Sequence, residues 1–263
     1  MSGTIHLTRD GAVATLTLDS PGKLNAISVA MWRALHEHAL AVAADDAVRC
    51  VVVRGAGGSF AAGADIDEFA SVRFDETSGR VYHLDILLPA LNALIDVPQP
   101  VIAAIEGVCV GGGLEIAAAC DVRIARADAR FGVPVGRLGF PLALPELAPL
   151  LQLVGPAVAA DLLLTQRLMD APAALAAGLV QRVAEVEAFD AEVAGALRGV
   201  LSGSPLAARQ NKAQIRSLMA KQRAAAAYTQ AELDASFAFL GWGDYKEGVA
   251  AFLAKRPAKF SGA

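Results

Sequence analysis

Two short stretches at the start of the chain, residues 5–9 and 13–18, mix apolar and polar residues in a way typical of β-strands. The dipeptide Asp10-Gly11 between them is a strong signal for a tight hairpin turn. The sequence therefore predicts that the chain opens with two antiparallel strands.

The next stretches switch between helical and strand spacing. Apolar residues recur every three or four positions at Met31, Leu35 and Ala39, and Ser28 stands where a helix N-cap is expected. Continuous apolar runs at residues 50–53 and 101–105 are typical of buried strands, residues 114–119 have helical character, and residues 122–125 are again predicted as a strand. Alternating strands and helices of this kind predict an α/β fold.

From about residue 144 the strand signals become rare, and only residues 179–183 keep strand character. Helices are predicted over residues 157–165, 173–177, 189–201, 206–221 and 231–240. The predicted architecture is a mixed α/β core followed by a helical C-terminal region, with no Gly/Ser/Pro-rich linker between them.

The charge and the cysteines argue against several classes of protein. The 263 residues carry 23 basic and 27 acidic side chains, a net charge of −4, so the positive stripe of a nucleic-acid-binding protein is not expected. Charged residues and prolines interrupt the most apolar stretches, which argues against a membrane span, and the N-terminus does not resemble a signal peptide. Three cysteines without a CxxC spacing indicate reduced, buried thiols and a cytoplasmic protein.

A glycine-rich turn at residues 55–60 follows one predicted strand, but it lacks the third glycine of a dinucleotide-binding fingerprint. Asp65 and Glu68, just after it, have the spacing of a helix capping box. The small residues before Asp65 leave backbone N–H groups open to an anion or a polarised carbonyl group.

A second glycine-rich stretch, Gly111-Gly112-Gly113, is followed by Glu115 and is the most informative in the chain. Successive glycines at a helix start carry an entropic cost, and either a close backbone approach or tight packing would explain them. Glu115 favours a functional reason because its helical neighbours are apolar on nearly every side, so we expect a desolvated carboxylate. Burial raises the pKa of such a group and the helix N-terminus lowers it, and the sequence leaves this balance open.

Other kinds of chemistry lack the residues that they need. His36 and His38 are two positions apart, which places them on different faces of their helix and favours a solvated surface over a metal site. The sequence has no HExxH motif, no Cys/His cluster and no GxSxG motif. We therefore expect neither a bound metal nor a serine nucleophile.

Several motifs, taken in order, resemble the enoyl-CoA hydratase/isomerase (crotonase) family. The matching segments are Asn25-Ala26, residues 60–66, 100–107 and 111–121, and residues 247–252 with Lys255-Arg256, and they extend over essentially the whole chain. The resemblance implies a spiral of ββα units over residues 1–195. It also implies a helical region over residues 196–263 that covers the active site, and assembly as a trimer or a dimer of trimers.

The resemblance also implies roles for individual residues. Ala64 and Gly112 would donate the two backbone N–H groups of an oxyanion hole that holds the thioester oxygen of an acyl-CoA, where preorganised donors stabilise a developing enolate. Glu115 would activate the water that adds to a 2-enoyl-CoA, and no cofactor is implied. The residues expected to line the acyl-CoA site are Leu24, Ala26, Ala62, Asp65, Ile66, Gly111 and Val135.

Val135 marks the main departure from the family. Hydratases of the family carry a second glutamate there, and the loss of a general acid/base typically costs about 10²–10⁴-fold in rate. Glu106 and Glu146 are candidate replacements, although we expect Glu106 to end a strand and Glu146 to face solvent at a helix start. Residues 140–146 also replace a glycine-rich segment of the family, so a reshaped acyl pocket is expected.

Hydration of a 2-enoyl-CoA is the leading hypothesis. The alternatives within the family are isomerisation, C–C cleavage and thioester hydrolysis, and the alternative outside catalysis is a protein that only binds acyl-CoA.

Overall fold

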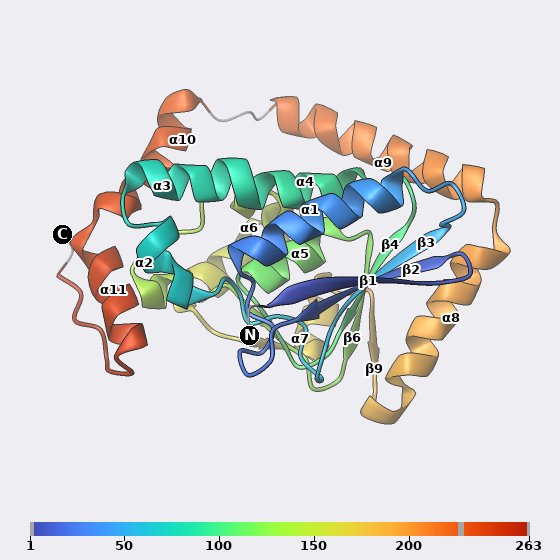
Figure 1. Cartoon of the computed structure of the whole chain (residues 1–263), viewed down its shortest axis with the longest axis horizontal. Coiled ribbons are helices and arrows are strands. Elements are labelled where there is room, and N and C mark those ends of the chain that lie inside the picture. Colours follow the sequence, from blue (N-terminus) through green and yellow to red (C-terminus); the bar gives the residue numbers. More distant parts are fainter. Residues whose placement is uncertain (1–2, 226–228, 262–263) are drawn as a thin grey trace.

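Two mixed sheets and the helices around them make up the fold (Figure 1). The computed structural model describes residues 3–225 and 229–261, without the side chains of residues 220–225. A six-stranded sheet has the order β1-β2-β3-β4-β6-β9, and a three-stranded sheet has the order β5-β7-β8.

Most neighbouring strands of the large sheet are parallel. Its strands are β1 (Thr4–Asp10), β2 (Val13–Asp19), β3 (Cys50–Gly55), β4 (Val101–Ile105), β6 (Val122–Arg126) and β9 (Arg182–Ala184). Only β1 and β2 pair antiparallel, and Gly11 at φ +54° lies in the turn between them. The predicted hairpin and the predicted α/β fold are therefore confirmed.

The small sheet was not predicted. It consists of β5 (Val108–Val110), β7 (Arg130–Gly132) and β8 (Met169–Asp170). Because β5 follows β4 after only two residues and leads directly into a helix, the chain repeats a strand-strand-helix unit. That helix is α5 (Gly112–Ala119), which begins within the triple glycine.

Helices pack on the large sheet: α1 (Val29–Ala43) contacts β1 and β2, and α8 (Phe189–Ser202) contacts β3, β6 and β9. The other helices of this part are α4 (Leu88–Asp96), α6 (Leu144–Thr165), α7 (Ala171–Ala176) and the short η4 (Val186–Ala188). The Ser28 hydroxyl accepts a hydrogen bond from the Met31 N–H, as expected of the N-cap of α1.

The two faces of the central strands contact different clusters of apolar residues. In β3, Val51 and Val53 join the main core, whereas Cys50 and Val52 pack with α8 residues such as Phe189. Both faces of the strand are thus buried, which explains its continuous apolar run.

The segment between β3 and β4 is helical, whereas the sequence predicted only a helix start at Asp65 there. It contains η1 (Ile66–Glu68), α2 (Phe69–Val72), α3 (Glu76–Arg80), the π-helical η2 (Val81–Leu87) and α4. Another short 3-10 helix, η3 (Val135–Leu138), follows β7.

The C-terminal part is helical, as predicted. It comprises α9 (Pro205–Ala225), α10 (Gln230–Phe237), η5 (Ala238–Gly241) and α11 (Gly243–Leu253). In Figure 1, α9 runs along one edge of the molecule, and α10 and α11 lie at the opposite end beside α2 and α3. The predicted boundary after residue 195 falls within α8, so the two proposed regions share that helix.

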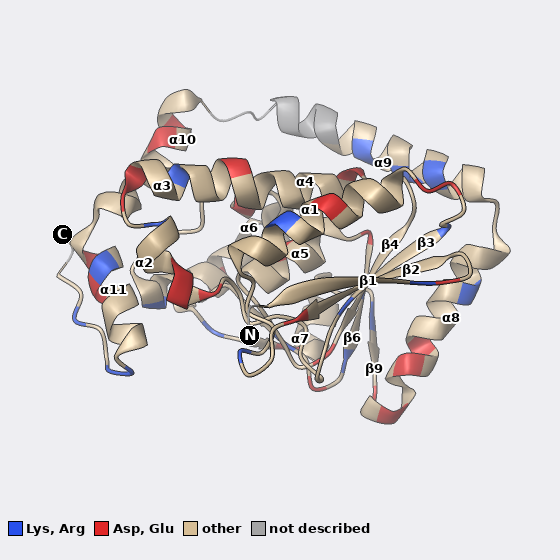
Figure 2. Cartoon of the chain, viewed as in Figure 1, with Lys and Arg blue, Asp and Glu red and all other residues tan. Residues whose placement is uncertain are grey.

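Charged residues of both signs are spread over the molecule (Figure 2). Basic residues lie along α9, and acidic residues lie on α8 and α10, in keeping with the small net charge.

By length and composition alone, α6 is long and apolar enough to cross a membrane. The helix packs against α5, and 22% of its apolar window is buried. Gly155, at φ +71°, also breaks the helical geometry of α6.

Candidate functional site

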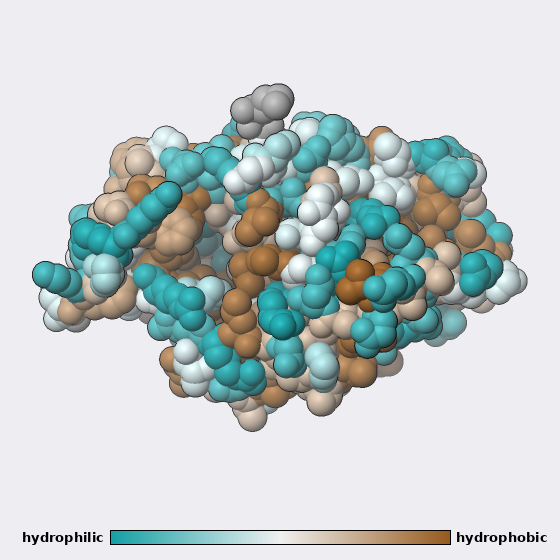
Figure 3. Space-filling model, turned by 90° about the horizontal axis from the view of Figure 1, so that it is seen from below, coloured by the Kyte–Doolittle hydropathy of each residue, from teal (hydrophilic) through white to brown (hydrophobic). Residues whose placement is uncertain are grey.

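A cavity of about 270 Å³ lies between α2, η2, α5, η3 and the first turn of α6. Figure 3 shows hydrophobic side chains gathered beside a hollow, toward the end of the molecule that carries the C-terminal helices. Most of the lining is apolar and backbone, and the polar side chains come from Arg73, His83, Glu115, Arg137 and Glu146. An apolar pocket with a few convergent polar groups is the usual form of a small-molecule site.

Two backbone N–H groups in this cavity have no acceptor. The amides of Ala64 and Gly112 take part in none of the hydrogen bonds of the described residues, although the neighbouring Asp65 and Glu115 amides do. A Cβ atom placed on Gly112 would lie 3.6 Å from the Ala64 nitrogen, so the two amides are close neighbours. Gly112 opens α5, and a helix N-terminus favours negative charge.

The triple glycine has a packing reason as well. A Cβ on Gly112 would lie 3.0 Å from the Trp32 ring, and a Cβ on Gly113 would lie 2.4 Å from the Ala61 carbonyl oxygen. Gly111 adopts a φ of +49°, a conformation that favours glycine. Both explanations of the glycines given by the sequence therefore hold.

Glu115 projects from the first turn of α5 into the cavity. The residue is half-buried because it lines the cavity, but its Oε2 atom is buried and has no hydrogen-bond partner. Burial, and then the charge of Glu146, raise the pKa of this carboxyl group well above its usual value, against the opposing effect of Arg73. The balance that the sequence left open is thus decided by burial.

Glu146 lies in the same cavity, which corrects the prediction that it faces solvent. It is 6% exposed, in the first turn of α6, and its carboxyl group shares a hydrogen bond with Nδ1 of His83 from η2. Burial raises the pKa of Glu146 to about 7. The prediction failed because α6 is apolar on nearly all sides, so the sequence did not indicate which side packs inward.

His83 is itself buried, with 2% of its surface exposed. Burial, and then the nearby charge of Arg73, hold its pKa well below the usual value, so the imidazole is neutral at pH 7. Its Nε2 atom has no hydrogen-bond partner. The cavity therefore contains two carboxyl groups and a neutral imidazole.

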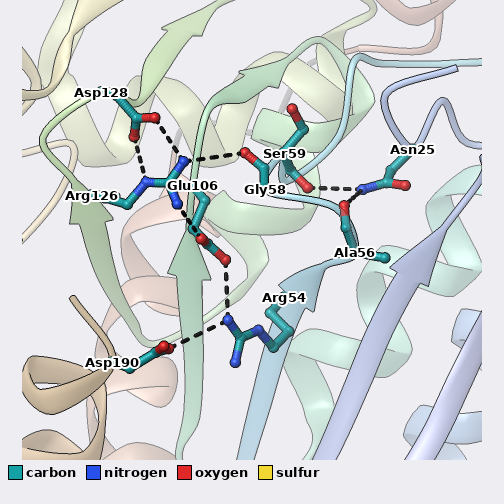
Figure 4. Close-up of polar contacts among 9 residues, drawn as sticks. All are labelled: Asn25, Arg54, Ala56, Gly58, Ser59, Glu106, Arg126, Asp128 and Asp190. Atoms are coloured by element: carbon teal, nitrogen blue, oxygen red, sulfur yellow. Dashed lines mark hydrogen bonds and ion pairs between the residues drawn. The ribbon is translucent and has the colours of Figure 1, made fainter. Parts of the chain in front are cut away.

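Glu106 lies outside the cavity, at the end of β4, as predicted (Figure 4). It accepts hydrogen bonds from Arg126 at 2.5 Å and from Arg54 at 3.1 Å. Arg126 also reaches the Gly58 carbonyl oxygen, and Asn25 donates to the Ala56 and Ser59 carbonyl oxygens from the other side. This network fixes the turn after β3 that leads to the Ala64 amide.

The structure brings most of the predicted site residues together. Those that line the cavity are Ala62, Ala64, Ile66, Gly111, Gly112, Glu115 and Val135. Leu24, Ala26 and Asp65 do not line it. They belong to the adjoining loops, where the Ala62 N–H donates to the Leu24 carbonyl oxygen and the Leu24 side chain is 55% exposed.

The predicted capping box at Asp65 and Glu68 is not formed. Asp65 does accept a hydrogen bond from the Asp67 N–H at the start of η1, but Glu68 accepts one from the Val29 N–H at 2.7 Å. Glu68 therefore caps α1, a helix that precedes it in the chain.

The remaining candidate residues, the cysteines and two histidines, make contacts that stabilise the fold. The three cysteines are free and buried, as predicted. His36 and His38 each hydrogen-bond a backbone carbonyl group, of Pro89 and Ile5. Within residues 3–225 and 229–261, no group of three or more metal-ligating side chains comes together.

Sequence reasoning missed three polar side chains of the cavity, Arg73, His83 and Arg137. Arg73 and His83 lie between β3 and β4, where only a helix start at Asp65 was predicted, and Arg137 lies in η3. Charged or titratable residues among apolar positions were the only signal, and the π-helical turn of η2 obscured the spacing around His83.

Comparisons with known proteins agree with this geometry. Residues 8–263 match the enoyl-CoA hydratase/isomerase family. A probable enoyl-CoA hydratase of Rhizobium meliloti is 36% identical over 98% of this chain and 97% of its own, and a crotonyl-CoA hydratase of Syntrophomonas wolfei is 34% identical over 97% of each. The crystal structure of an enoyl-CoA hydratase/carnithine racemase from Magnetospirillum magneticum, 44% identical, superposes with a TM-score of 0.81 over 99% of this chain and 96% of that one.

Proposed function

The chain belongs to the enoyl-CoA hydratase/isomerase family, and on that premise we propose that it adds water to the double bond of a 2-enoyl-CoA with two glutamates, Glu115 and Glu146. The observation that carries the proposal is that both carboxyl groups meet in one cavity with two unpaired backbone amides. Glu146, from α6, supplies the second carboxyl group that Val135 cannot.

The amides of Ala64 and Gly112 form the oxyanion hole of the proposed site. They bind the thioester oxygen, on which negative charge develops when a nucleophile attacks C3 of the enoyl group. Two preorganised donors at a helix N-terminus stabilise that enolate, and removal of one such donor typically costs about 10²–10³-fold in rate.

The two glutamates divide the proton transfers. Ionised Glu115 accepts a proton from water as its oxygen bonds to C3, and protonated Glu146 donates a proton to C2 of the enolate. The pair needs one proton between them, and burial together with mutual repulsion favours this state because two adjacent charged carboxylates are costly. His83, neutral and hydrogen-bonded to Glu146, orients that carboxyl group.

The substrate's CoA part extends over the loops beside the cavity. Leu24, Ala26 and Asp65 belong to these loops, and the exposed Leu24 side chain offers apolar surface to the nucleotide. The proposed chemistry is proton transfer and charge stabilisation, so it requires no cofactor.

We also place the enzyme in the cytoplasm as a homo-oligomer, a trimer or a dimer of trimers. Exposed apolar side chains on α9, including Ile215 and Leu218, support assembly because such side chains mark interaction surfaces when they gather. The reduced cysteines support the compartment.

Loss of the conjugated enoyl-thioester absorbance of crotonyl-CoA tests the reaction. We expect the wild-type protein to remove this absorbance and Glu115→Gln to be slower by about 10²–10⁴-fold, because a general base has been lost. Glu37→Gln, a change at an exposed glutamate of α1, serves as the matched control and should not alter the rate.

Binding of butyryl-CoA, measured by calorimetry, completes the test. Hydration by the wild type that survives in Glu115→Gln would overturn the assignment of the base. Binding without loss of absorbance would favour another reaction of the family or a non-catalytic acyl-CoA-binding role.

A further inference from the structure

Arg73 is a buried cation with no ionic partner. It follows α2, and 4% of its surface is exposed. Its Nε and Nη1 atoms are buried without a hydrogen-bond partner, and it takes part in none of the ion pairs of the described residues. An unpaired buried charge is costly, so such an arrangement is rare without a compensating ligand.

The other deeply buried basic residues contrast with Arg73. Arg123 donates hydrogen bonds to the carbonyl oxygens of Leu179, Ala117 and Cys120. Lys212 pairs with Asp121 and donates to the Gln99 carbonyl oxygen. Arg73 alone among these three has open donors.

Aromatic rings hold the Arg73 guanidinium in place at the cavity wall. Its Cζ atom lies 4.1 Å from the ring centres of Phe69 and Tyr82 and 5.7 Å from that of Phe140. Cation–π contacts of this kind keep a guanidinium in a fixed orientation. The Tyr82 and Tyr245 hydroxyl groups also lie near Arg73, but they carry no charge to balance it, and its Nε and Nη1 atoms keep no partner.

The nearby acids form no ion pair with Arg73. Glu115 and Glu146 line the same cavity, and one of them stays protonated in the proposed cycle, but among the described residues neither is within ion-pair distance of Arg73, and His83 is neutral. The apolar walls, which include Leu142 and Val135, keep the local dielectric low, so an incoming anion would be bound strongly.

We propose that Arg73 binds a carboxylate at the far end of the substrate's acyl chain, so that this enzyme acts on 2-enoyl-CoA thioesters of dicarboxylic acids. The proposal rests on the proposed function, because it assumes that the cavity holds the acyl group. A guanidinium N–H group without a partner can form a short, charge-assisted hydrogen bond with a carboxylate. The CoA phosphates do not fit this role, because Arg73 is too deeply buried to meet groups at the protein surface.

Two saturated acyl-CoA thioesters test the proposal without catalysis. Glutaryl-CoA ends in a carboxylate, and 5-methylhexanoyl-CoA has an isopropyl group of the same shape in its place. By calorimetry we expect the wild type to bind glutaryl-CoA at least about tenfold more tightly, as a charge-assisted hydrogen-bonded pair would give. Equal binding, or tighter binding of the neutral compound, would overturn the proposal whether or not any variant folds.

Variants of Arg73 assign the preference to this residue. Arg73→Met keeps the bulk of the side chain and should abolish the preference, whereas Arg73→Lys should keep part of it. Arg137→Met is the matched control: Arg137 also lines the cavity but is exposed and donates to the Gln166 carbonyl oxygen, so the preference should persist. Weaker binding of both compounds by the same factor in Arg73→Met would indicate a structural role and overturn the proposal.

Turnover separates this proposal from the proposed function. The unsaturated pair, glutaconyl-CoA and 5-methylhex-2-enoyl-CoA, should show the same preference in kcat/KM, lost in Arg73→Met. If the protein prefers to bind glutaryl-CoA but hydrates neither enoyl compound, the proposed substrate class is supported and the proposed hydration reaction is wrong. If it hydrates both enoyl compounds at equal rates and shows no binding preference, the proposed reaction is supported and the proposed substrate class is wrong.

Discussion

Two polar regions of the molecule differ in how completely their groups are satisfied. The Glu106 network (Asn25, Arg54, Glu106, Arg126 and the turn at residues 56–59) pairs its charged groups with one another or with backbone (Figure 4). In the cavity, Glu115, His83 and Arg73 each keep at least one buried polar atom without a partner. A buried network whose groups all have partners stabilises one conformation. Buried polar groups without partners raise the free energy of the folded protein, and a ligand that pairs with them lowers it again.

Glu106 and Glu146 make this comparison concrete, because both were candidates for the second acid. Two arginines hold Glu106 beside the turn after β3, whereas Glu146 has one neutral imidazole as its hydrogen-bond partner and a raised pKa. The Glu106 network therefore stabilises the fold, whereas the cavity contains groups that can exchange a proton.

The largest expected effect comes from removing the acid of the cavity. Glu146→Gln should lower kcat for crotonyl-CoA by about 10²–10⁴-fold, the usual cost of a lost general acid. Glu106→Gln should leave kcat close to that of the wild type while lowering the melting temperature. Similar kcat values for the two variants would remove the functional distinction between the two regions.

The oxyanion hole should be nearly as sensitive. Gly112→Ala places a Cβ atom 3.0 Å from Trp32 and beside the Ala64 amide, so we expect kcat to fall by about 10²–10³-fold. Gly199→Ala, in the exposed part of α8 where a Cβ meets nothing within 4 Å, is the control and should not change kcat. Unchanged kcat in Gly112→Ala would argue that the two amides do not hold the thioester oxygen.

The pH dependence of stability should reveal the raised pKa of Glu146. The pKa of Glu146 is about 7 in the folded protein against 4.5 as the ordinary value, so the folded state retains a proton that the unfolded state loses as the pH rises through this interval. The contribution of Glu146 to the free energy of unfolding therefore declines from pH 4.5 to about 7, by up to about 3 kcal/mol.

Chemical denaturation at pH 5 and pH 8 measures this effect. Glu146→Gln should lose less stability than the wild type between the two pH values, and at pH 8 it should be the more stable protein. Glu106→Gln should be less stable than the wild type at pH 8 because it weakens two ion pairs. A parallel pH profile for Glu146→Gln and the wild type would contradict the raised pKa.

The smallest effect is expected at the protein surface. Lys23 pairs with Asp65 at 2.7 Å and Asp67 at 2.8 Å, but 41% of its side chain is exposed. Lys23→Met should therefore lower the free energy of unfolding by only about 0.2–1 kcal/mol, and added salt should shrink the difference. A decrease in the free energy of unfolding several times larger, and independent of salt, would contradict this prediction. It would show that Lys23 stabilises the loop before α1 in the way that Glu106 stabilises the turn after β3.

Much of the fold was predictable because its strands and helices have clear periodicity. The hairpin, the run at β3, the Ser28 cap and the C-terminal helices each have a local signal, and Glu115 was found because its neighbours on α5 are apolar. The small sheet was missed because β5, β7 and β8 are only two or three residues long.

The rest of the candidate site depends on tertiary packing that no local pattern encodes. Glu146 enters the cavity because the first turn of α6 faces His83, which lies 63 residues earlier in the chain. Glu68 caps α1 and not its own helix, and Arg73 is buried by rings from three separate segments. Such contacts become visible only when distant segments are placed together.

The π-helical turn η2 gives the site an unusual dependence on backbone length. Tyr82 and Leu87 are five residues apart and both buried, the spacing of a π-helix, and His83 lies between them. Removing one residue here, such as the exposed Asp85, would allow an ordinary α-helix and rotate the preceding helical residues by about 100° relative to α4. His83 would then leave Glu146 with no change in either side chain, so the chemistry of the cavity is specified by the count of residues in one helical turn as well as by their identities.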